Sequence, residues 1–441
     1  MRRVITGQTI TAKLKLYVSK EQKNSLDELC FGYRNALNYA SKIAFENNKT
    51  SSSSKIQKLV YSHIRTEFNI PSQMSCSVCH QVGATYQGLW TKVKDNAKHI
   101  KSGYTKKRYK GLDKAPKFIS RTATLQYKKD FGFKKEQEVS VQTRDGRIQI
   151  RYTGFNKHIE LIKQGGRIGA SKLYYSKNTK QYYLLVSIEV QTTEQKINTV
   201  KSVDLGQRNL AVVHDTNNKI NFYKGRKVLH IANKISIQRK QLQKKDTRSA
   251  TKKLIVLSGR ERRFKMDINH TISKNIVTPN SVIGLENLKG IREKTHKRRK
   301  GKNASEKQRK ANSNNSKWAF GEMTNFIEYK SKLIGSQVIK VDADYTSQMC
   351  IKCGHTSKDN RKNGNIIFKC VMCSYTLHSD LLGSRNILLR TISVLQDKTE
   401  TGLLVKKPNV SDVETKAERL KRFSELRWSS DTSQRALAVG I

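Results

Sequence analysis

The sequence is short of acidic residues. Of its 441 residues only 35 are Asp or Glu, against 87 Lys or Arg, and the formal net charge is +52. A globular protein does not need such an excess to fold, and the excess destabilises a compact state unless a polyanion neutralises it. Nucleic acid and an acidic membrane surface are the two polyanions to consider, so the charge predicts one of them as a partner.

Long apolar runs are also missing. No stretch of about 18 consecutive apolar residues occurs, so the sequence predicts no bilayer-spanning helix. The opening residues MRRVITGQTITAKLKL carry two arginines without the apolar core of a signal peptide. We therefore expect no membrane partner and a cytoplasmic, nucleoid-associated protein of a bacterial host, with nucleic acid as its partner. On charge alone, a passive RNA-coating protein of the ribosomal type stays open.

The seven cysteines are an odd number, and disulfides are not expected in a cytosolic chain. Four of them form two C-x2-C pairs that are separated by 16 residues: Cys350, Cys353, Cys370 and Cys373. This spacing predicts a four-thiolate zinc ribbon, in which each pair offers two soft ligands to one Zn2+. A shell of four cysteines has no open coordination position, so we expect a structural zinc ion and not a catalytic one.

The other cysteines do not have this arrangement. Cys76 and Cys79 are spaced as a pair and precede His80, but no second pair lies nearby. We interpret both, and Cys30, as small buried hydrophobic residues.

The first half of the sequence predicts strands that flank a helical insert. Residues 10–18 alternate apolar and polar side chains as a strand does, and apolar spacing of three and four residues predicts helices over 22–47, 54–68 and 79–97. From about residue 118 the period returns to two, with a hairpin signal at Asp145-Gly146 and a second turn near 177–179. We expect a small β-barrel that includes the first strand, with the helices inserted.

From about residue 199 strands and helices alternate, which favours an α/β domain. Helices are expected over 227–245, 252–277, 318–335 and 379–395. Residues 292–310 hold ten Lys or Arg and two Glu, which is typical of a polycationic loop.

Three acidic residues stand next to apolar segments. Asp204 ends the strand VKSVD, Glu286 lies in VIGLENL, and Asp380 begins DLLGSRNILL. A carboxylate in such a setting is usually paired or binds a metal, and Mg2+ prefers oxygen ligands. Two ions about 3.5–4 Å apart would activate water and stabilise a leaving 3′ oxygen. An aspartate at a strand end before a glycine can also be only a turn residue, and spacing does not prove that the three converge.

The order of these motifs resembles one known family. SVDLGQRNLAVV, VIGLENLKGIR, YTSQMCIKCGH, FKCVMC and HSDLLGSRNIL follow one another as in the TnpB family, which is related to miniature type V CRISPR effectors and to the Fanzor proteins. The similarity extends to WAFGEMTNFIEYKSKLIGSQVIKVDADYTSQMCIKCG and to the opening KLKLYVSKEQKNSLDELCFGYRNALNYA. It covers roughly residues 9–390 and is most specific from Val200 onward.

The resemblance implies an RNA-guided DNA endonuclease with an RNase H-like (RuvC) domain. In it Asp204, Glu286 and Asp380 would be catalytic and hold two Mg2+ ions, and the four cysteines would form a ribbon that helps to load the target strand. The implied partners are a guide RNA from the transposon end and double-stranded and unwound target DNA, bound by a monomer rather than a dimer. One departure is visible, because Leu382 stands where the family usually has Asn after the third acid.

The resemblance also implies a multidomain α+β architecture. A β-barrel wedge domain carries an inserted helical recognition lobe, and an RNase H-like α/β domain follows that is interrupted by the zinc ribbon. The expected boundaries are wedge 1–18 and 113–196, recognition 19–112, RuvC 197–345 and 377–395, ribbon 346–376, and a tail 396–441.

We expect the phosphate contacts in the most basic segments, which are 101–117, 234–245, 252–265 and 292–310. Four aromatic residues could stack on bases, although packing is the favoured interpretation for each: Tyr104, Tyr109, Tyr127 and Phe131.

Three functions compete. They are an active guided nuclease (TnpB-like, or a miniature CRISPR effector), a cleavage-inactive guided DNA-binding protein on the same fold, and a DNA-strand transferase. A missing acidic residue would favour the second, and strand joining without RNA would favour the third.

Overall fold

The computed structural model describes residues 5–177, 179–193, 196–288, 319–364 and 366–399. The loop 292–310 and nearly all of the expected tail 396–441 lie outside these residues. The chain divides into two compact units, and each is described by itself. One is Thr9–Val190, and the other is the chain from Gln191 onward together with residues 1–8. No helix in the described ranges combines the length and apolar character needed to cross a bilayer.

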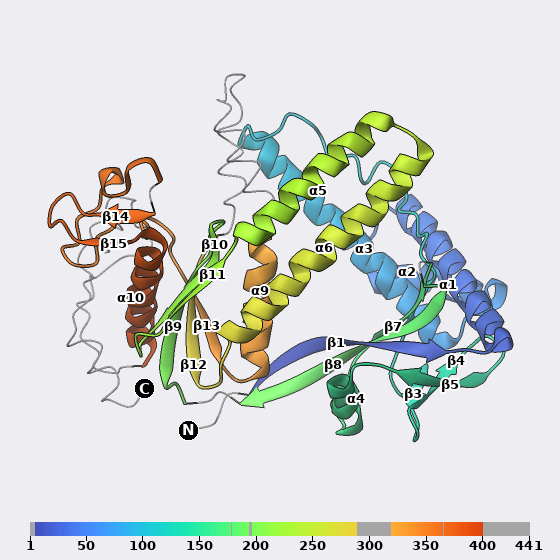
Figure 1. The fold of residues 1–441 in the computed structure, drawn as a ribbon. Helices are drawn as coiled ribbons and strands as arrows, with labels where there is room; N and C mark the ends of the chain where they lie inside the picture. Colours follow the sequence, from blue (N-terminus) through green and yellow to red (C-terminus); the bar gives the residue numbers. More distant parts are fainter. Residues whose placement is uncertain (1–4, 178, 194–195, 289–318, 365, 400–441) are drawn as a thin grey trace. The chain divides into compact units, whose positions relative to one another are not determined.

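The N-terminal unit combines three long helices with one antiparallel sheet (Figure 1). The helices are α1 (Lys20–Glu46), α2 (Ser53–Glu67) and α3 (Ser72–Lys101). Helix α1 begins with a capping box, in which the Ser19 hydroxyl accepts from the Gln22 N–H and the Gln22 side chain accepts from the Ser19 N–H. The three helices confirm the helical segments expected from the apolar spacing.

The sheet of this unit has the order β2-β7-β8-β1-β5-β4-β3, with β6 pairing β8. Its strands are β1 (Ile5–Tyr17), β2 (Thr122–Leu125), β3 (Phe131–Phe133), β4 (Glu138–Gln142), β5 (Arg147–Thr153), β6 (Arg167–Ile168), β7 (Ser171–Ser176) and β8 (Gln181–Thr193), and the short helix α4 (Asn156–Lys163) follows β5. The expected turn at Asp145-Gly146 joins β4 and β5, and Gly146 has a φ of 127° there. The first strand lies between β8 and β5, so the helices are an insertion in the sheet, as predicted.

A closed barrel was the wrong expectation. The described pairings form an open path from β2 to β3, and no described ladder joins these two ends. Residues 126–130 connect β2 to β3 by a tight turn in which the Asp130 carboxylate accepts from the Gln126 N–H at 2.8 Å. The chain bends back at this point without adding the ladder that closure would need.

The inserted helices and the sheet share one hydrophobic core, which explains several residues singled out from the sequence. Cys30 and Cys79 are fully buried in it, as expected, and Cys76 is half-buried on α3. Phe131 is also fully buried and packs against Tyr127 at a ring separation of 5.5 Å. Packing is therefore confirmed for these two aromatic residues.

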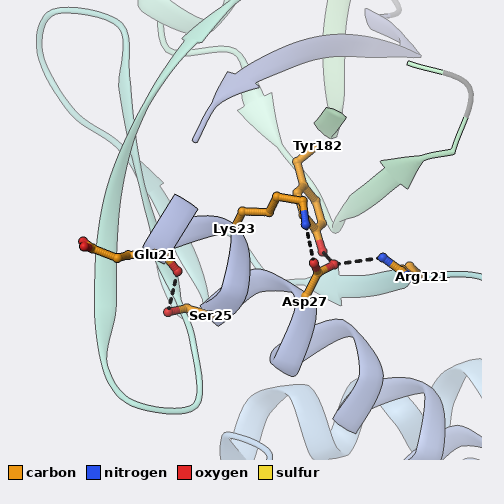
Figure 2. Close-up of polar contacts among 6 residues, drawn as sticks. All are labelled: Glu21, Lys23, Ser25, Asp27, Arg121 and Tyr182. Atoms are coloured by element: carbon orange, nitrogen blue, oxygen red, sulfur yellow. Dashed lines mark hydrogen bonds and ion pairs between the residues drawn. The ribbon is translucent and has the colours of Figure 1, made fainter. Parts of the chain in front are cut away.

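A half-buried ion-pair cluster ties α1 to the sheet of the N-terminal unit (Figure 2). The Asp27 carboxylate accepts from Tyr182 Oη at 2.7 Å and Lys23 Nζ at 2.8 Å, and it lies 3.2 Å from Arg121 Nη1. Burial tends to raise the pKa of Asp27, but the hydrogen bonds from Lys23 and Tyr182 and the two positive charges outweigh it and lower that pKa. The ionised form of Asp27 is therefore stabilised in the folded unit.

We expect Asp27→Asn to lower the free energy of unfolding of the N-terminal unit by about 1–3 kcal/mol at neutral pH, because its three partners lose a charged acceptor. Folding lowers the pKa of Asp27, so its ionised carboxylate contributes fully to the free energy of unfolding above the ordinary pKa of 3.8. This contribution is lost as the pH falls through the lowered pKa. Urea unfolding at pH 7 and at pH 3 measures both effects. Glu21→Gln is the control, because Glu21 lies outside the ion pairs of Figure 2, and an equal loss in both variants would contradict the prediction.

The C-terminal unit is built on a mixed sheet with the order β11-β10-β9-β12-β13. The strands are β9 (Thr199–Asp204), β10 (Asn209–Asp215), β11 (Ile220–Lys224), β12 (Ser281–Glu286) and β13 (Gln337–Val341). Strands β9, β12 and β13 run parallel, while β10 and β11 are antiparallel to their neighbours. The interior strand β10 is buried at every residue, as a strand covered on both faces should be.

Helices cover both faces of this sheet. On one face lie α5 (Arg226–Lys245), α6 (Arg248–Ile276) and α9 (Phe320–Leu333), which contribute Val228, Ile272 and Met323 to a core with β9, β10 and β12. On the other lies α10 (Ser379–Thr399), whose Ile387 and Leu388 pack on β9, β12 and β13. These helices confirm the alternating α/β pattern expected from residue 199 onward.

Candidate active site and metal centre

The expected zinc ligands are brought together by a small two-stranded element. Strands β14 (Ile367–Lys369) and β15 (Thr376–His378) pair antiparallel, and the 3-10 helix η2 (Lys358–Gly364) precedes them. The two cysteine pairs form similar turns, since Gly354 N–H donates to Cys350 O and Ser374 N–H donates to Cys370 O. Gly354 and Ser374 have φ values of 76° and 56°, and glycine adopts this left-handed conformation without steric cost.

The four thiols fit a tetrahedral ion. Their sulfur atoms all lie within 4.8 Å of one another, with 3.6 Å between Cys350 and Cys373 and 3.5 Å between Cys353 and Cys370. Zn–S bonds of about 2.3 Å in a tetrahedron place sulfur atoms about 3.8 Å apart, which is close to these separations. Burial raises the pKa of the Cys350 thiol to about 12, while the Tyr375 N–H lowers that of Cys373 to about 7. Zinc binding would therefore release protons, and its affinity would fall as the pH is lowered.

Asp204 and Glu286 end two parallel neighbouring strands, β9 and β12. Leu285 pairs with Val203, so the two carboxylates that follow them emerge side by side at the same edge of the sheet. Parallel strands place their carboxyl ends at one edge, where functional side chains commonly gather in open α/β sheets.

Asp380 joins them from the first turn of α10. Its carboxylate accepts from Asn209 Nδ2 at 2.8 Å, and Asn209 begins the strand next to β9. Helix α10 approaches β9 very closely at Gly383, where an added Cβ would lie 2.9 Å from Asp204 Oδ2. The three predicted acidic residues therefore gather at one edge of the sheet, although they are far apart in the sequence.

Their electrostatic setting favours a cation. Burial raises the pKa of Asp204 well above its usual range, and the charges of Glu286 and Asp380 raise it further, against a lowering by Arg361. Burial also raises the pKa of Glu286, although the Thr346 hydroxyl and the charge of Arg390 oppose it. Carboxylates that repel one another in this way fit a hard cation, which would relieve the repulsion.

The three carboxylates are spread more widely than the four thiols. Among the described residues, only the cysteines have ligand atoms that all lie within 4.8 Å of one another. This spacing does not fit three ligands on a single ion. It is compatible with two ions about 3.5–4 Å apart that the carboxylates share between them.

Several residues at this edge were not predicted from the sequence. Arg361 from η2 lies 3.5 Å from Asp380 and brings a positive charge from the ribbon to the carboxylates. Thr346 donates to Glu286 Oε1 at 2.5 Å, and Asn209 holds Asp380. Thr346 and Asn209 stand inside motifs already noted, YTSQ and DLGQRNL, whereas nothing in KDNRKNG distinguishes Arg361 from a surface cation.

Leu382, the departure from the family pattern, is fully buried beneath the four cysteines, with Ile351 and Phe368. It makes no polar contact with the carboxylates. The neighbouring Ser384 hydroxyl lies 2.9 Å from the Ser202 hydroxyl of β9, and this buried pair ties α10 to the sheet. Helix α10 is thus held against β9 by close packing and by hydroxyl contacts.

Two family models match segments of the chain. Residues 183–291 match the OrfB_IS605 model, described as "Probable transposase", and residues 320–387 match the "Cas12f1-like, TNB domain" model. The first segment contains Asp204 and Glu286, and the second contains Asp380 and the four cysteines. Both site elements therefore fall inside the matched segments.

Parts of the chain are similar in sequence to known proteins. The chain is 40% identical over 75 residues to a CRISPR-associated endodeoxyribonuclease Cas12f1 of Sulfoacidibacillus thermotolerans, across 17% of this chain and 18% of the relative. It is 31% identical over 175 residues to the TnpB-like protein MJ0751 of Methanocaldococcus jannaschii, across 38% of this chain and 59% of that one. Each match thus spans less than two thirds of the relative's own length.

The fold also has a counterpart among solved structures. A Cas12f1–sgRNA–target DNA complex matches with a TM-score of 0.53 and 15% identity, across 87% of this chain and 99% of that protein. At this identity the likeness concerns the fold alone, which is a mixed α/β multidomain fold. Over these matched segments the chain is similar in sequence to TnpB-like and Cas12f proteins, as its motifs predict.

Proposed function

We propose that the chain is an RNA-guided DNA endonuclease of the TnpB type. The observation that carries the proposal is the gathering of Asp204, Glu286 and Asp380 at one sheet edge, where burial and mutual repulsion raise the pKa of Asp204. We further propose that this sheet is the RNase H-like (RuvC) nuclease domain, that the four-cysteine element is its zinc ribbon, and that the N-terminal unit supplies the wedge and recognition parts with the boundaries given above.

The proposed chemistry is hydrolysis of a DNA phosphodiester. Two Mg2+ ions held by the three carboxylates would supply an activated water and charge for the leaving oxygen. The chain's own groups do the positioning, since Asn209 and Arg361 contact Asp380, and Thr346 holds Glu286. Arg361 also places a positive charge where a phosphate would enter, and guanidinium groups suit phosphate oxygens.

The proposed partners are a guide RNA and the target DNA. Base pairing would read the target sequence, and the protein would contact backbones and a short adjacent motif. The chain has 87 Lys and Arg but only 35 Asp and Glu. This positive charge supports two partners whose backbones are negatively charged. We expect the protein to act as a monomer in the cytoplasm. The second candidate function is that of a miniature CRISPR effector, because Cas12f1 is among the matched relatives.

The test starts with purification from cells that carry the native locus. A discrete co-purifying RNA with a defined 3′ end, and Mg2+-dependent cutting of a plasmid that matches it, are expected. Strand joining to a donor end without RNA would instead support a transferase. Guided binding without any cutting would support the cleavage-inactive alternative.

A basic groove offers one surface for the phosphates. Helices α5 and α6 border a cavity of about 470 Å³ lined by Lys245, Lys252, Lys253 and Arg260, together with glutamine and aliphatic side chains. This groove lies within two of the segments from which phosphate contacts were expected. Its combination of cationic and aliphatic side chains is compatible with a nucleic-acid strand.

We expect the triple variant Lys252→Gln, Lys253→Gln and Arg260→Gln to bind the guide RNA or the guide–target duplex more weakly. The logarithmic dependence of affinity on salt should decrease by about 1 for each phosphate that the variant no longer neutralises. Fluorescence anisotropy at several salt concentrations measures this slope. The charge-preserving pair Lys252→Arg and Lys253→Arg is the control and should keep it, and an unchanged slope in the triple variant would remove the groove from the interface.

A further inference from the structure

The loop that leads into the first cysteine pair touches the proposed active site directly. Thr346 is buried, and its hydroxyl lies 2.5 Å from Glu286 Oε1 and 3.2 Å from Ala343 O. The shorter contact has the length of a charge-assisted hydrogen bond to a carboxylate. The hydroxyl proton is therefore directed at Glu286, and the Ala343 contact is secondary.

Helix α10 holds this loop in place. Asn386, which is fully buried, donates through Nδ2 to Thr346 O at 2.7 Å and to Met349 O at 2.9 Å. The same helix carries Asp380 in its first turn. One rigid element thus positions both Asp380 and the loop that contacts Glu286.

The ribbon holds the loop from the other side. Asn360 is buried and donates to Gln348 O at 2.9 Å and to His355 O at 3.1 Å, while its Oδ1 accepts from Val371 N–H at 3.0 Å. Its three partners are the loop, the first cysteine turn and the second cysteine turn. The position of the loop thus depends on the ribbon keeping its shape.

We propose that Thr346 is a positioning residue for Glu286 and that the zinc-loaded ribbon, through Asn360, keeps Thr346 in place. The inference rests on the proposed function and deepens it, because it makes the ribbon a support for the carboxylate site in addition to any role in loading DNA. A carboxylate turns about its last side-chain bond, and a fixed hydrogen bond to Oε1 leaves Oε2 to reach a cation. Loss of such a supporting contact typically weakens metal binding about 10–100-fold.

The first test compares Thr346→Val, which removes the hydroxyl at nearly constant volume, with Thr346→Ser, which keeps it. Mn2+ binding to the full chain is followed by electron paramagnetic resonance, and the carboxylate site is the component that Asp204→Asn removes. We expect Thr346→Val to weaken that component about 10–100-fold and Thr346→Ser, which keeps the hydroxyl, to stay close to wild type. Zinc content should match wild type in both variants, and wild-type Mn2+ binding by Thr346→Val would overturn the inference.

The second test concerns the link to the ribbon. Asn360→Ala keeps all four cysteines but removes the hydrogen bonds between the loop and both cysteine turns. We expect it to weaken Mn2+ binding in the wild-type background and to add little in the Thr346→Val background, because both substitutions act on the same contact. Additive losses would overturn the ribbon link, since they would mean independent effects.

The outcomes also separate this inference from the proposed function. A wild-type chain without any Mn2+ component that Asp204→Asn removes would overturn the carboxylate site and the inference with it. A normal wild-type component that Thr346→Val leaves unchanged would overturn the inference alone. Cleavage assays are not needed for either conclusion.

Discussion

Asp204→Asn, Glu286→Gln and Asp380→Asn are each expected to lower the rate of target cleavage at least about a thousandfold, which corresponds to about 4 kcal/mol of transition-state stabilisation. An amide keeps the shape of the side chain and loses the anionic oxygen that a hard cation requires. Guide RNA binding should stay at the wild-type level, because each substitution removes a single negative charge from a strongly basic chain. Single-turnover cleavage of a matched plasmid and RNA co-purification measure the two effects.

The matched control is Asp215→Asn. Asp215 is buried in the same sheet, at the end of β10, where it accepts from Asn217 N–H and Lys219 N–H. It pairs with Lys201, near the opposite end of β9 from Asp204. Cleavage by this variant should stay close to wild type. Wild-type cleavage by any of the three site variants would contradict the assignment.

Asp204→Asn should also stabilise the metal-free fold. Because folding raises the pKa of Asp204, its ionised form destabilises the metal-free fold above the ordinary value of 3.8, and this cost grows as the pH rises toward the raised pKa. Asp204→Asn removes the cost. In the absence of divalent cations we expect its melting temperature at pH 7 to rise by roughly 2–4 °C. The gain should shrink when Mg2+ is added, since the cation relieves the same repulsion in wild type.

Cys370→Ala is expected to have the second large effect, loss of the zinc ion together with the fold of the ribbon. Structural zinc sites contribute an apparent binding free energy of about 10–16 kcal/mol at pH 7, far more than the few hydrogen bonds of β14 and β15 can supply. Element analysis should give one zinc per wild-type chain and none for the variant. Hydrogen exchange should show faster exchange over residues 346–378, with the N-terminal unit unchanged.

Cys76→Ala is the control for this prediction. Cys76 belongs to the other C-x2-C pair, but it lies within α3 and accepts a hydrogen bond from Gln57 at 3.5 Å. Its replacement should leave the zinc content unchanged. A lower zinc content in this variant, or full zinc in Cys370→Ala, would show that the metal binds elsewhere.

The zinc cluster and the secondary structure were the most predictable features. The four cysteines are spaced by local turn geometry, so the sequence alone predicts that they gather. Apolar periodicity also predicted α1, α6 and α10, because each helix has an apolar face that follows its own repeat. The closed barrel was wrong because alternation predicts strands and their faces but not whether the last strand pairs with the first.

The contacts of the carboxylate site could not be predicted in the same way. Asp204 and Glu286 were candidates because each ends an apolar strand, but their adjacency depends on the parallel register that pairs Leu285 with Val203. Arg361 lies on η2, and the fold of the ribbon brings it within 3.5 Å of Asp380. The residues around Arg361 in the sequence resemble an ordinary charged loop.

The sequence by itself determined the charge, the four zinc ligands, the alternating strands and helices, and the three acidic candidates with their resemblance to TnpB. Each of these depends on composition or on spacing within one segment. Only the tertiary structure decided that the acids meet at one edge, that Asn209 and Thr346 hold two of them, and that Asn386 and Asn360 join α10 and the ribbon to the same loop. The reason is that these contacts join residues between 12 and 171 positions apart in the sequence. Strand register, helix packing and the fold of the ribbon bring them within hydrogen-bonding distance, and local pattern does not encode these.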